Sequence, residues 1–269
     1  MHHRLLILFA FAFQFASAQS KLGDVACVYI NTPNLDSSVA FYEKLDFAKS
    51  GANTFPIPWA QVSDGSLIIM MRKDDQPYIG LTYYVNDLDA KVAELEKDSI
   101  VFSQKPKAGD LVRRYFIKSP DGFSIMLVHN IGGFKAATGK TLLNMPQGDY
   151  MVPDKYPNKM AGAFGEFCHP VKDLKTSLVF WKKLGFEIKG NMTQPYPHAI
   201  LYDGSMIIGL HQTTHFDYPA ITYFGIKVTD RIKQLKEKGV GPLTEVAGMQ
   251  NVSLKTWEGQ HFFIFNLGM

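Results

Sequence analysis

The sequence of 269 residues contains two cysteines, no cluster of basic residues and, after its first 18 residues, no long apolar run. Cys27 and Cys168 lie in apolar, strand-like segments. We therefore predict free buried thiols, although an exported chain could also form a disulfide between them. Because no run of Lys or Arg marks a binding face for polyanions, we expect no nucleic-acid partner. No later segment reaches the roughly 18 apolar residues that a membrane-spanning helix needs.

The N-terminus has the layout of a secretory signal peptide. A short basic head that ends at Arg4 precedes an apolar run over residues 5–13 and the small-residue site Ala16-Ser17-Ala18. We predict a leader over residues 1–18 and an exported mature chain, periplasmic or secreted, without a membrane anchor once the leader is removed. The alternative, a lipoprotein anchored through Cys27, is disfavoured because Asp24 stands where a lipobox requires an apolar residue.

The remaining chain repeats itself. The segment FYEKLDF (residues 41–47) returns as FWKKLGF 139 residues later (residues 180–186), and DGSLII (residues 64–69) returns with the same offset as DGSMII (residues 203–208). Weaker matches continue in the same order, with TYY (residues 82–84) matching TYF (residues 222–224). The offset drifts slightly along the chain, but matches that persist in the same order over so long a stretch indicate a duplication.

Each copy reads as alternating strands and helices. In the first copy, strands are expected near residues 25–30, 47–51, 59–63, 67–72 and 79–85, with a final strand at residues 123–129. Helices are expected after Asn34 and over residues 88–97, and Asp173 caps the equivalent first helix of the second copy. We expect Phe41 and Phe180 to be core residues of these first helices. The pattern predicts an α+β fold: a first domain over residues 19–131, a linker over residues 132–160 and a second domain over residues 161–269, each built from two βαβββ modules.

The chain resembles the vicinal oxygen chelate superfamily, which includes glyoxalase I, bleomycin-resistance proteins, fosfomycin-resistance enzymes and extradiol dioxygenases. The resemblance rests on the entry NTPNLD (residues 31–36) up to Phe41-Tyr42, on its second version PVKDL (residues 170–174) up to Phe180-Trp181, and on the turn SPDG (residues 119–122). It implies that each pair of modules forms an open half-barrel around a cleft. In active members this cleft holds a divalent metal, with ligands from the first and last strand of each module.

The first copy lacks ligands at the positions that the resemblance implies. They are occupied by Cys27, Met70, Gly80 and Met126, none of which is an imidazole or a carboxylate. A hard or borderline metal finds no usable set of ligands there. We therefore expect a first cleft without metal.

The second copy has one ligand-type residue at these positions. Glu166 stands at the first, Gly209 at the second, Ala220 or Tyr223 at the third and Phe263 at the last. Side chains alternate along a strand, so the neighbours His211 and His261 face the same way as Gly209 and Phe263. Glu166, His211 and His261 could form a single divalent metal site or an acid–base group, with Glu166 as the catalytic residue. His169 is expected to face the helix instead, and His198 and His215 are interpreted as surface residues in turns.

The residue types of the clefts favour ligand binding over catalysis. We expect no metal cofactor, and we expect the clefts to bind a flat or aromatic molecule through the candidate residues Tyr29, Arg72, Tyr83, Met126, Tyr223, Phe263 and Phe265. One alternative is a metal-dependent lyase, isomerase or dioxygenase that works in the second domain alone. Another is a vestigial cleft in a protein with an interaction role. The partner is expected to be a small molecule, and the chain a monomer or a homodimer.

Overall fold

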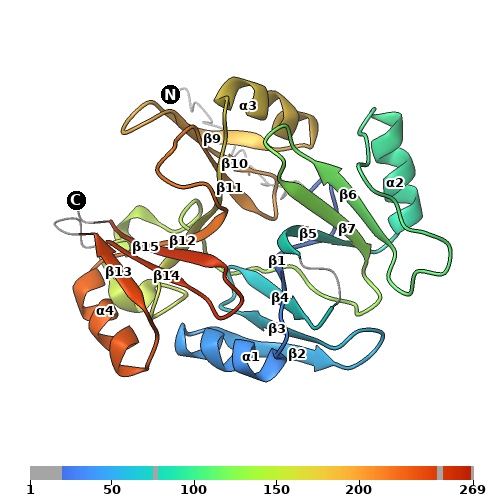
Figure 1. Ribbon diagram of the computed structural model, residues 1–269. Coiled ribbons are helices and arrows are strands. Elements are labelled where there is room, and N and C mark those ends of the chain that lie inside the picture. The colour runs from blue at the N-terminus through green and yellow to red at the C-terminus, as the bar shows by residue number, and fades with distance from the viewer. Residues whose placement is uncertain (1–19, 75–77, 247–250, 268–269) are drawn as a thin grey trace, which may run out of the picture.

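The structure of the protein, a computed structural model, describes residues 20–74, 78–246 and 251–267. The predicted leader lies outside the described residues. Two mixed sheets lie side by side, with the four helices at the periphery (Figure 1). None of the helices in the described ranges is long and apolar enough to cross a membrane.

The first sheet contains seven strands in the order β2-β3-β4-β1-β5-β7-β6. Its first module has the predicted βαβββ order: β1 (Val25–Asn31), α1 (Leu35–Lys44), β2 (Ala48–Asn53), β3 (Trp59–Ser63) and β4 (Ile68–Arg72). Helix α1 begins after Asn34, whose side chain accepts a hydrogen bond from the Ser37 N–H, as the sequence predicts for an N-cap. The parallel pairing of β1 with β4 and the antiparallel pairing of β1 with β5 join the two modules into one sheet.

The second module of this sheet is shorter than predicted. It comprises β5 (Ile79–Val85), α2 (Leu88–Lys97), β6 (Arg114–Lys118) and β7 (Ser124–His129). The expected strand before β6 is reduced to an isolated bridge between Gln104 and Phe116. The segment after this bridge contains Pro106, which has no backbone N–H to donate to a ladder, and Gly109, whose φ is positive. These residues prevent a regular strand, so this module is βαββ and the prediction of three strands after its helix was wrong.

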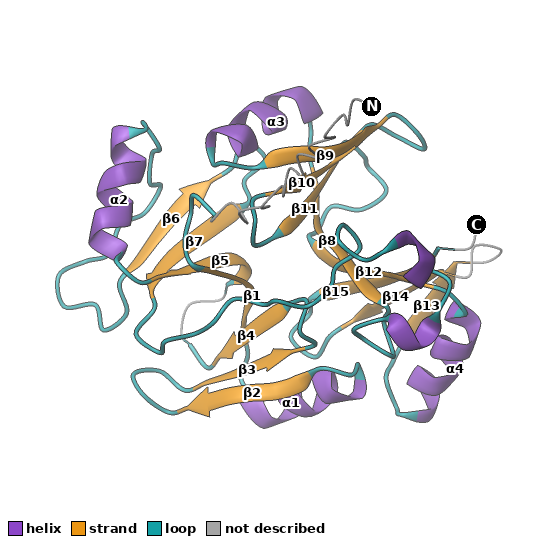
Figure 2. Ribbon diagram, turned by 180° about the vertical axis from the view of Figure 1, so that it is seen from behind, coloured by secondary structure: helices purple, strands orange, loops and turns teal. Residues whose placement is uncertain are grey.

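The second sheet contains eight strands in the order β13-β14-β15-β12-β8-β11-β10-β9 and has both modules complete. The first module comprises β8 (Ala163–Pro170), α3 (Leu174–Lys183), β9 (Glu187–Met192), β10 (His198–Tyr202) and β11 (Ile207–His211). The second comprises β12 (Ala220–Gly225), α4 (Val228–Glu237), β13 (Leu243–Val246), β14 (Asn251–Lys255) and β15 (His261–Asn266). Helices α2 and α4 lie at opposite ends of the molecule (Figure 2).

The segment between the sheets packs against both of them. It contains two short 3-10 turns, Gln147–Asp149 and Pro153–Lys155. The Gly139 N–H donates to the Gly65 carbonyl oxygen at 2.7 Å, and the Leu142 N–H donates to the Phe164 carbonyl oxygen at 2.8 Å. A side chain at position 139 would collide with the Gly65 backbone, which explains why this crossing uses glycine.

One apolar core extends through both sheets on the faces that α1 to α4 cover. Trp181 on α3 is anchored in this core and is 1% exposed. Its equivalent on α1, Tyr42, is fully buried. Phe41 and Phe180 pack against the core but are only half-buried. The expectation that these two phenylalanines are the core residues was therefore wrong by one position, because the helices turn the following residue inward.

Candidate functional site

The two sheets each have a second face, turned away from the helices, and we call these the first and second open faces. In the first sheet this face carries a separate apolar cluster that includes Cys27, Tyr29, Met70, Tyr84 and Met126. Phe134, from the segment between the sheets, completes this cluster. Its ring lies 5.0 Å from that of Trp59 and 4.7 Å from that of Tyr84.

Tyr78 occupies further space on the first open face. Its hydroxyl lies 2.8 Å from the Leu81 carbonyl oxygen and 3.0 Å from the Ser124 carbonyl oxygen, and its one hydrogen can be donated to either. A Cβ at Gly80 would lie 2.6 Å from the Tyr78 hydroxyl oxygen, so the ring stands where a ligand side chain at position 80 would be. The positions that the family resemblance assigns to metal ligands are therefore packed with apolar and aromatic side chains on this face. Of the candidate ligand-binding residues, Tyr29 and Met126 lie in this packing, and Arg72 is 5% exposed at its edge.

The second open face contains a buried acid–imidazole pair. Glu166 on β8 is 3% exposed and His211 at the end of β11 is 9% exposed. The His211 Nε2 and the Glu166 Oε1 are 2.9 Å apart. The other polar atoms of the pair, Glu166 Oε2 and His211 Nδ1, are buried without a hydrogen-bond partner in the described chain. Buried polar atoms without a partner are costly, which makes this pair a candidate binding site.

Gly209 is the residue that allows the pair to form. It lies next to Cys168 in the parallel ladder of β8 and β11, two residues before His211. A Cβ on Gly209 would lie 1.8 Å from Glu166 Oε2 and 2.7 Å from His211 Nε2. The carboxylate and the imidazole therefore meet in the space that a side chain at position 209 would fill.

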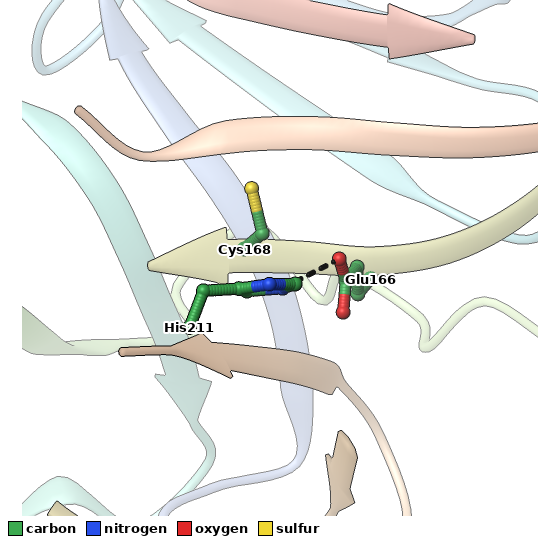
Figure 3. A group of neighbouring side chains, drawn as sticks. All are labelled: Glu166, Cys168 and His211. Carbon is green, nitrogen blue, oxygen red and sulfur yellow. Dashed lines mark hydrogen bonds and ion pairs between the residues drawn. The ribbon is translucent and has the colours of Figure 1, made fainter. Parts of the chain in front are cut away.

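Cys168 adds a third donor beside the pair. Figure 3 shows its thiol on the same strand as Glu166, with the His211 ring directed toward the Glu166 carboxylate. Glu166, Cys168 and His211 can each place one ligand atom within 4.8 Å of the others. Burial, and then the charge of Glu166, raises the pKa of the Cys168 thiol, so the thiol is protonated at neutral pH.

This donor set fits a borderline divalent ion such as Zn²⁺. A carboxylate, a thiolate and an imidazole are common zinc ligands, and three protein ligands leave one position open. The unpartnered Glu166 Oε2 and the space above Gly209 are consistent with such an ion. A hard ion such as Mg²⁺ would not favour the thiolate.

His261 is not part of this group. It begins β15, which is separated from β8 by β12, so its backbone lies two strands, or about 10 Å, from Cys168. Its ring stacks on Tyr218 at a centroid distance of 3.3 Å. The structure therefore does not bring Glu166, His211 and His261 together as one metal set. The third residue beside Glu166 and His211 is Cys168.

Two of the aromatic candidates lie on the second open face, and two others lie on the helix-covered side of the sheets. Phe263 and Phe265 are half-buried on the second open face, with ring centroids 5.7 Å apart, and Phe263 also contacts Phe216. Tyr83 and Tyr223 lie on the opposite face, in the core that both sheets share. Of the two residues considered for the third ligand position, Ala220 pairs with Cys168 and lies on the open face, whereas Tyr223 points away from it.

The sequence interpretation missed several residues around His211. His198, interpreted as a surface residue in a turn, begins β10, and its ring stacks on that of His211 at 5.4 Å, because the two residues are directly paired across the ladder. The rings of Tyr196 and Phe216 lie 5.8 Å and 5.7 Å from His211. His169 faces α3 as predicted and stacks on Trp181. His215 is exposed, as predicted.

A cavity of about 780 Å³ adjoins the second open face. Tyr196 and Phe216 line this cavity and also contact His211, so the cavity and the acid–imidazole pair share an aromatic wall. His215 and Gln212 line it from the loop after β11, and Asp121 contributes from the first sheet. The volume is typical of cavities that bind small molecules.

Three solved structures show the same arrangement over nearly the whole chain. The 2,3-dioxygenase LapB of Pseudomonas sp. KL28 is 14% identical, with a TM-score of 0.55 and 94% of each chain covered. The Mn(II)-bound glyoxalase of Novosphingobium aromaticivorans is 15% identical, with a TM-score of 0.53, and 92% of this chain and 83% of that chain are covered. The homoprotocatechuate 2,3-dioxygenase of Arthrobacter globiformis is 12% identical, with a TM-score of 0.54 and coverages of 93% and 80%.

No protein-family model matches the sequence, and comparison with curated proteins gives no significant match. The similarity to the solved structures is one of fold, because the identities are low. The similarity extends over both sheets. The chain has the tandem two-domain α+β fold of these dioxygenases and this glyoxalase, which is the fold that the family resemblance implies.

Proposed function

We propose that this is an exported protein that binds a small, flat molecule on the second open face, with the Glu166–His211 pair as its polar anchor and without a requirement for metal. The observation that carries the proposal is the buried pair itself, with one oxygen and one nitrogen left without partners. On the first open face the equivalent space is filled by the chain's own side chains, so the proposal places the ligand on the second open face alone.

The chemistry of the ligand follows from the surroundings of the pair. Tyr196, Phe216 and Phe263 present aromatic rings, which favour a flat apolar or aromatic molecule. Glu166 Oε2 is an acceptor and calls for an N–H or O–H donor on the ligand. The ligand is therefore a planar molecule with at least one hydrogen-bond donor.

The pair can also act as an acid–base group. When the His211 Nε2–H donates to Glu166, the Nδ1 atom is left as a proton acceptor. In this arrangement Glu166 orients His211 and His211 exchanges the proton.

A ligand screen on chelator-treated mature protein tests the proposal. Aromatic compounds with and without hydroxyl or amino donors are compared by thermal shift, and affinities are measured for those that bind. We expect binding that survives chelator and that falls at least about tenfold in Glu166→Gln, since a buried charged hydrogen bond is lost. Glu187→Gln, in an exposed residue of β9, is the matched control and keeps full affinity. Affinity that depends strictly on added metal contradicts the proposal.

A second candidate function is a metal-dependent lyase, isomerase or dioxygenase acting at the same place. The observation that favours it is the position of the Cys168 thiol beside the pair. Glu166, Cys168 and His211 would hold the ion. A bound divalent ion would supply Lewis-acid stabilisation of an anion formed on the substrate.

Metal analysis decides between the two candidates. Protein purified without chelator is analysed for zinc, iron and manganese together with Cys168→Ser, Glu166→Gln and the control Cys27→Ser. Our first proposal expects well under one metal ion per chain in all of them. Close to one ion per chain, lost in Cys168→Ser and Glu166→Gln but kept in Cys27→Ser, makes the enzyme the better conclusion.

A further inference from the structure

The Glu166–His211 pair is closed off from the cavity that adjoins it. Glu166, Cys168 and His211 are all buried, and none of them lines the cavity of about 780 Å³. The two rings that line the cavity and also contact His211 are those of Tyr196 and Phe216. A molecule that passes from the cavity to the pair therefore has to displace one of these two rings.

Tyr196 is firmly held. It stands between Pro195 and Pro197, and a proline restricts both its own backbone and that of the residue before it. The Tyr196 carbonyl oxygen accepts a hydrogen bond from His198 Nδ1 at 2.9 Å. The Pro197 carbonyl oxygen accepts one from the Gln212 N–H at 2.9 Å, which ties this hairpin to the start of the loop after β11.

Phe216 lies in a part of that loop with little backbone support. The loop is anchored at His215, whose N–H donates to the Thr213 hydroxyl at 3.1 Å. It is anchored again at Pro219, whose carbonyl oxygen accepts a hydrogen bond from the Gln260 side chain at 3.1 Å. Among the described residues, the backbone of the three residues between these anchors has no hydrogen-bond partner. Segments of this kind open locally more readily than the rest of a fold.

The Phe216 side chain contacts other rings. Its centroid lies 5.7 Å from that of His211, 6.0 Å from that of Tyr218 and 6.2 Å from that of Phe263. The side chain is half-buried, and the cavity beside it offers space into which the ring can turn. Because a phenyl ring forms no ordinary hydrogen bond, this turn breaks none.

The first open face provides a contrast. There Phe134 packs against the cluster that contains Cys27. The backbone of Phe134 is fixed by one side chain, because its N–H donates to Asn130 Oδ1 at 2.8 Å and its carbonyl oxygen accepts from Asn130 Nδ2 at 3.0 Å. Phe134 is thus a fixed plug, whereas Phe216 has no such support.

We propose that Phe216 is the gate between the cavity and the Glu166–His211 pair. Turning of its ring, together with the loop segment that carries it, joins the cavity to the buried space around the pair. The Cys168 thiol reports on this space, since its sulfur lies within 4.8 Å of ligand atoms of Glu166 and His211. The passage of a ligand through the gate rests on the function proposed above, whereas the opening of the gate does not.

Thiol labelling of the full mature chain, treated with chelator, tests the gate. Both cysteines of the chain are buried, and the reaction of each with N-ethylmaleimide is followed by peptide mass spectrometry. We expect Cys168 to react faster than Cys27. Phe216→Ala raises the Cys168 rate at least about tenfold and leaves the Cys27 rate unchanged, since the opening is local. Phe265→Ala, in a half-buried phenylalanine of the same face that does not line the cavity, changes neither rate.

Two further measurements keep the test decisive. Phe216→Leu removes the ring but keeps an apolar side chain, and we expect a smaller rise of the Cys168 rate. Low concentrations of denaturant should change the Cys168 rate little, because local opening exposes little surface, whereas labelling through global unfolding rises steeply.

The proposal is overturned if folded Phe216→Ala labels Cys168 at the wild-type rate or raises both thiol rates equally. It is also overturned if Phe265→Ala raises the Cys168 rate as much, or if this rate follows denaturant as global unfolding does. If Phe216→Ala does not fold, Phe216→Leu decides, and a wild-type Cys168 rate in that variant overturns the proposal. A ligand screen without binding leaves these rates as they are, so failure of the proposed function and failure of the gate are distinguished.

Discussion

The Tyr83 hydroxyl in the first sheet donates a hydrogen bond of 2.5 Å to the Asp203 Oδ2 atom in the second. The reverse contact also exists, because Tyr223 donates to the Asp64 Oδ2 atom at 2.6 Å. Both aspartates belong to the Asp-Gly turns by which the repeat was recognised, and both tyrosines belong to repeated strands. The duplication has thus produced a pair of reciprocal contacts across the core, each joining a turn of one copy to a strand of the other.

These contacts predict a matched loss of stability in Tyr83→Phe and Tyr223→Phe. Each substitution removes one donor from a carboxylate, buried at Asp203 and half-buried at Asp64, and leaves the apolar packing in place. We expect each to lower the free energy of unfolding by about 1.5 to 3 kcal/mol, the usual range for hydrogen bonds to charged groups. Denaturant unfolding measures this effect. Tyr202→Phe, which removes a bond from a half-buried hydroxyl to the Gly204 carbonyl oxygen, is the control. Losses no larger than that of the control would show that the reciprocal contacts do not hold the domains together.

Gly209 is predicted to be necessary for the acid–imidazole pair. The added methyl group of Gly209→Ala would lie 1.8 Å from Glu166 Oε2, so the carboxylate must leave its place beside His211. We expect ligand affinity to fall as far as it does in Glu166→Gln. Gly148→Ala is the control, because a Cβ there meets no atom within 4 Å and the backbone has no positive φ. Unchanged affinity in folded Gly209→Ala would remove the pair from the binding site.

The elements of the fold were largely predictable because they depend on local patterns. The helix at residues 88–97 and the strands at residues 59–63 and 79–85 occur at the predicted positions, since the periodicity and the N-caps are local signals. The face on which Glu166 and His211 lie also follows from strand alternation. What alternation does not give is the order of the strands, and this order decides whether Cys168 or His261 is the third residue.

The remaining errors concern the positions of segments that cross the faces. Nothing in the sequence indicates that Phe134 enters the first open face, because it lies in a segment without periodicity. His198, which is predicted from the sequence to lie in a turn, is the first residue of β10, and the prolines at positions 195 and 197 directly precede this strand. Such errors arise because tertiary packing, and not local propensity, places a loop or begins a strand.

The first helices of the two copies predict unequal effects for adjacent aromatic residues. Trp181 is 1% exposed, whereas Phe180 is only half-buried. We expect Trp181→Ala to cost about 3 to 5 kcal/mol, as large-to-small changes in a core do, and Phe180→Ala to cost clearly less. Val179→Ala, in a side chain that is 67% exposed, serves as the baseline. Thermal unfolding ranks the three variants, and a larger loss for Phe180→Ala than for Trp181→Ala would contradict the burial described here.

His169 predicts how stability depends on pH. Its ring is 3% exposed, lies 3.8 Å from the Phe123 ring of the other domain and has no hydrogen-bond partner at either nitrogen in the described chain. Burial, and then the positive field of His211, lowers the pKa of His169 from 6.5 to about 3. The aromatic side chains packed around it, Phe123, Phe167 and Trp181, supply no charge that would oppose this shift.

The sign of the effect follows from proton uptake. Between pH 6.5 and about 3 the unfolded chain binds a proton at His169 that the folded chain does not bind. Stability is therefore complete above pH 6.5, and it falls by up to about 1.4 kcal/mol for each pH unit below that value. In His169→Leu this contribution is absent, so its free energy of unfolding should decline less steeply than that of the wild type between pH 6.5 and 4.5. His215→Leu, in an exposed histidine, should keep the wild-type slope. Parallel slopes for the wild type and His169→Leu in denaturant unfolding would show that His169 takes up its proton in the folded protein.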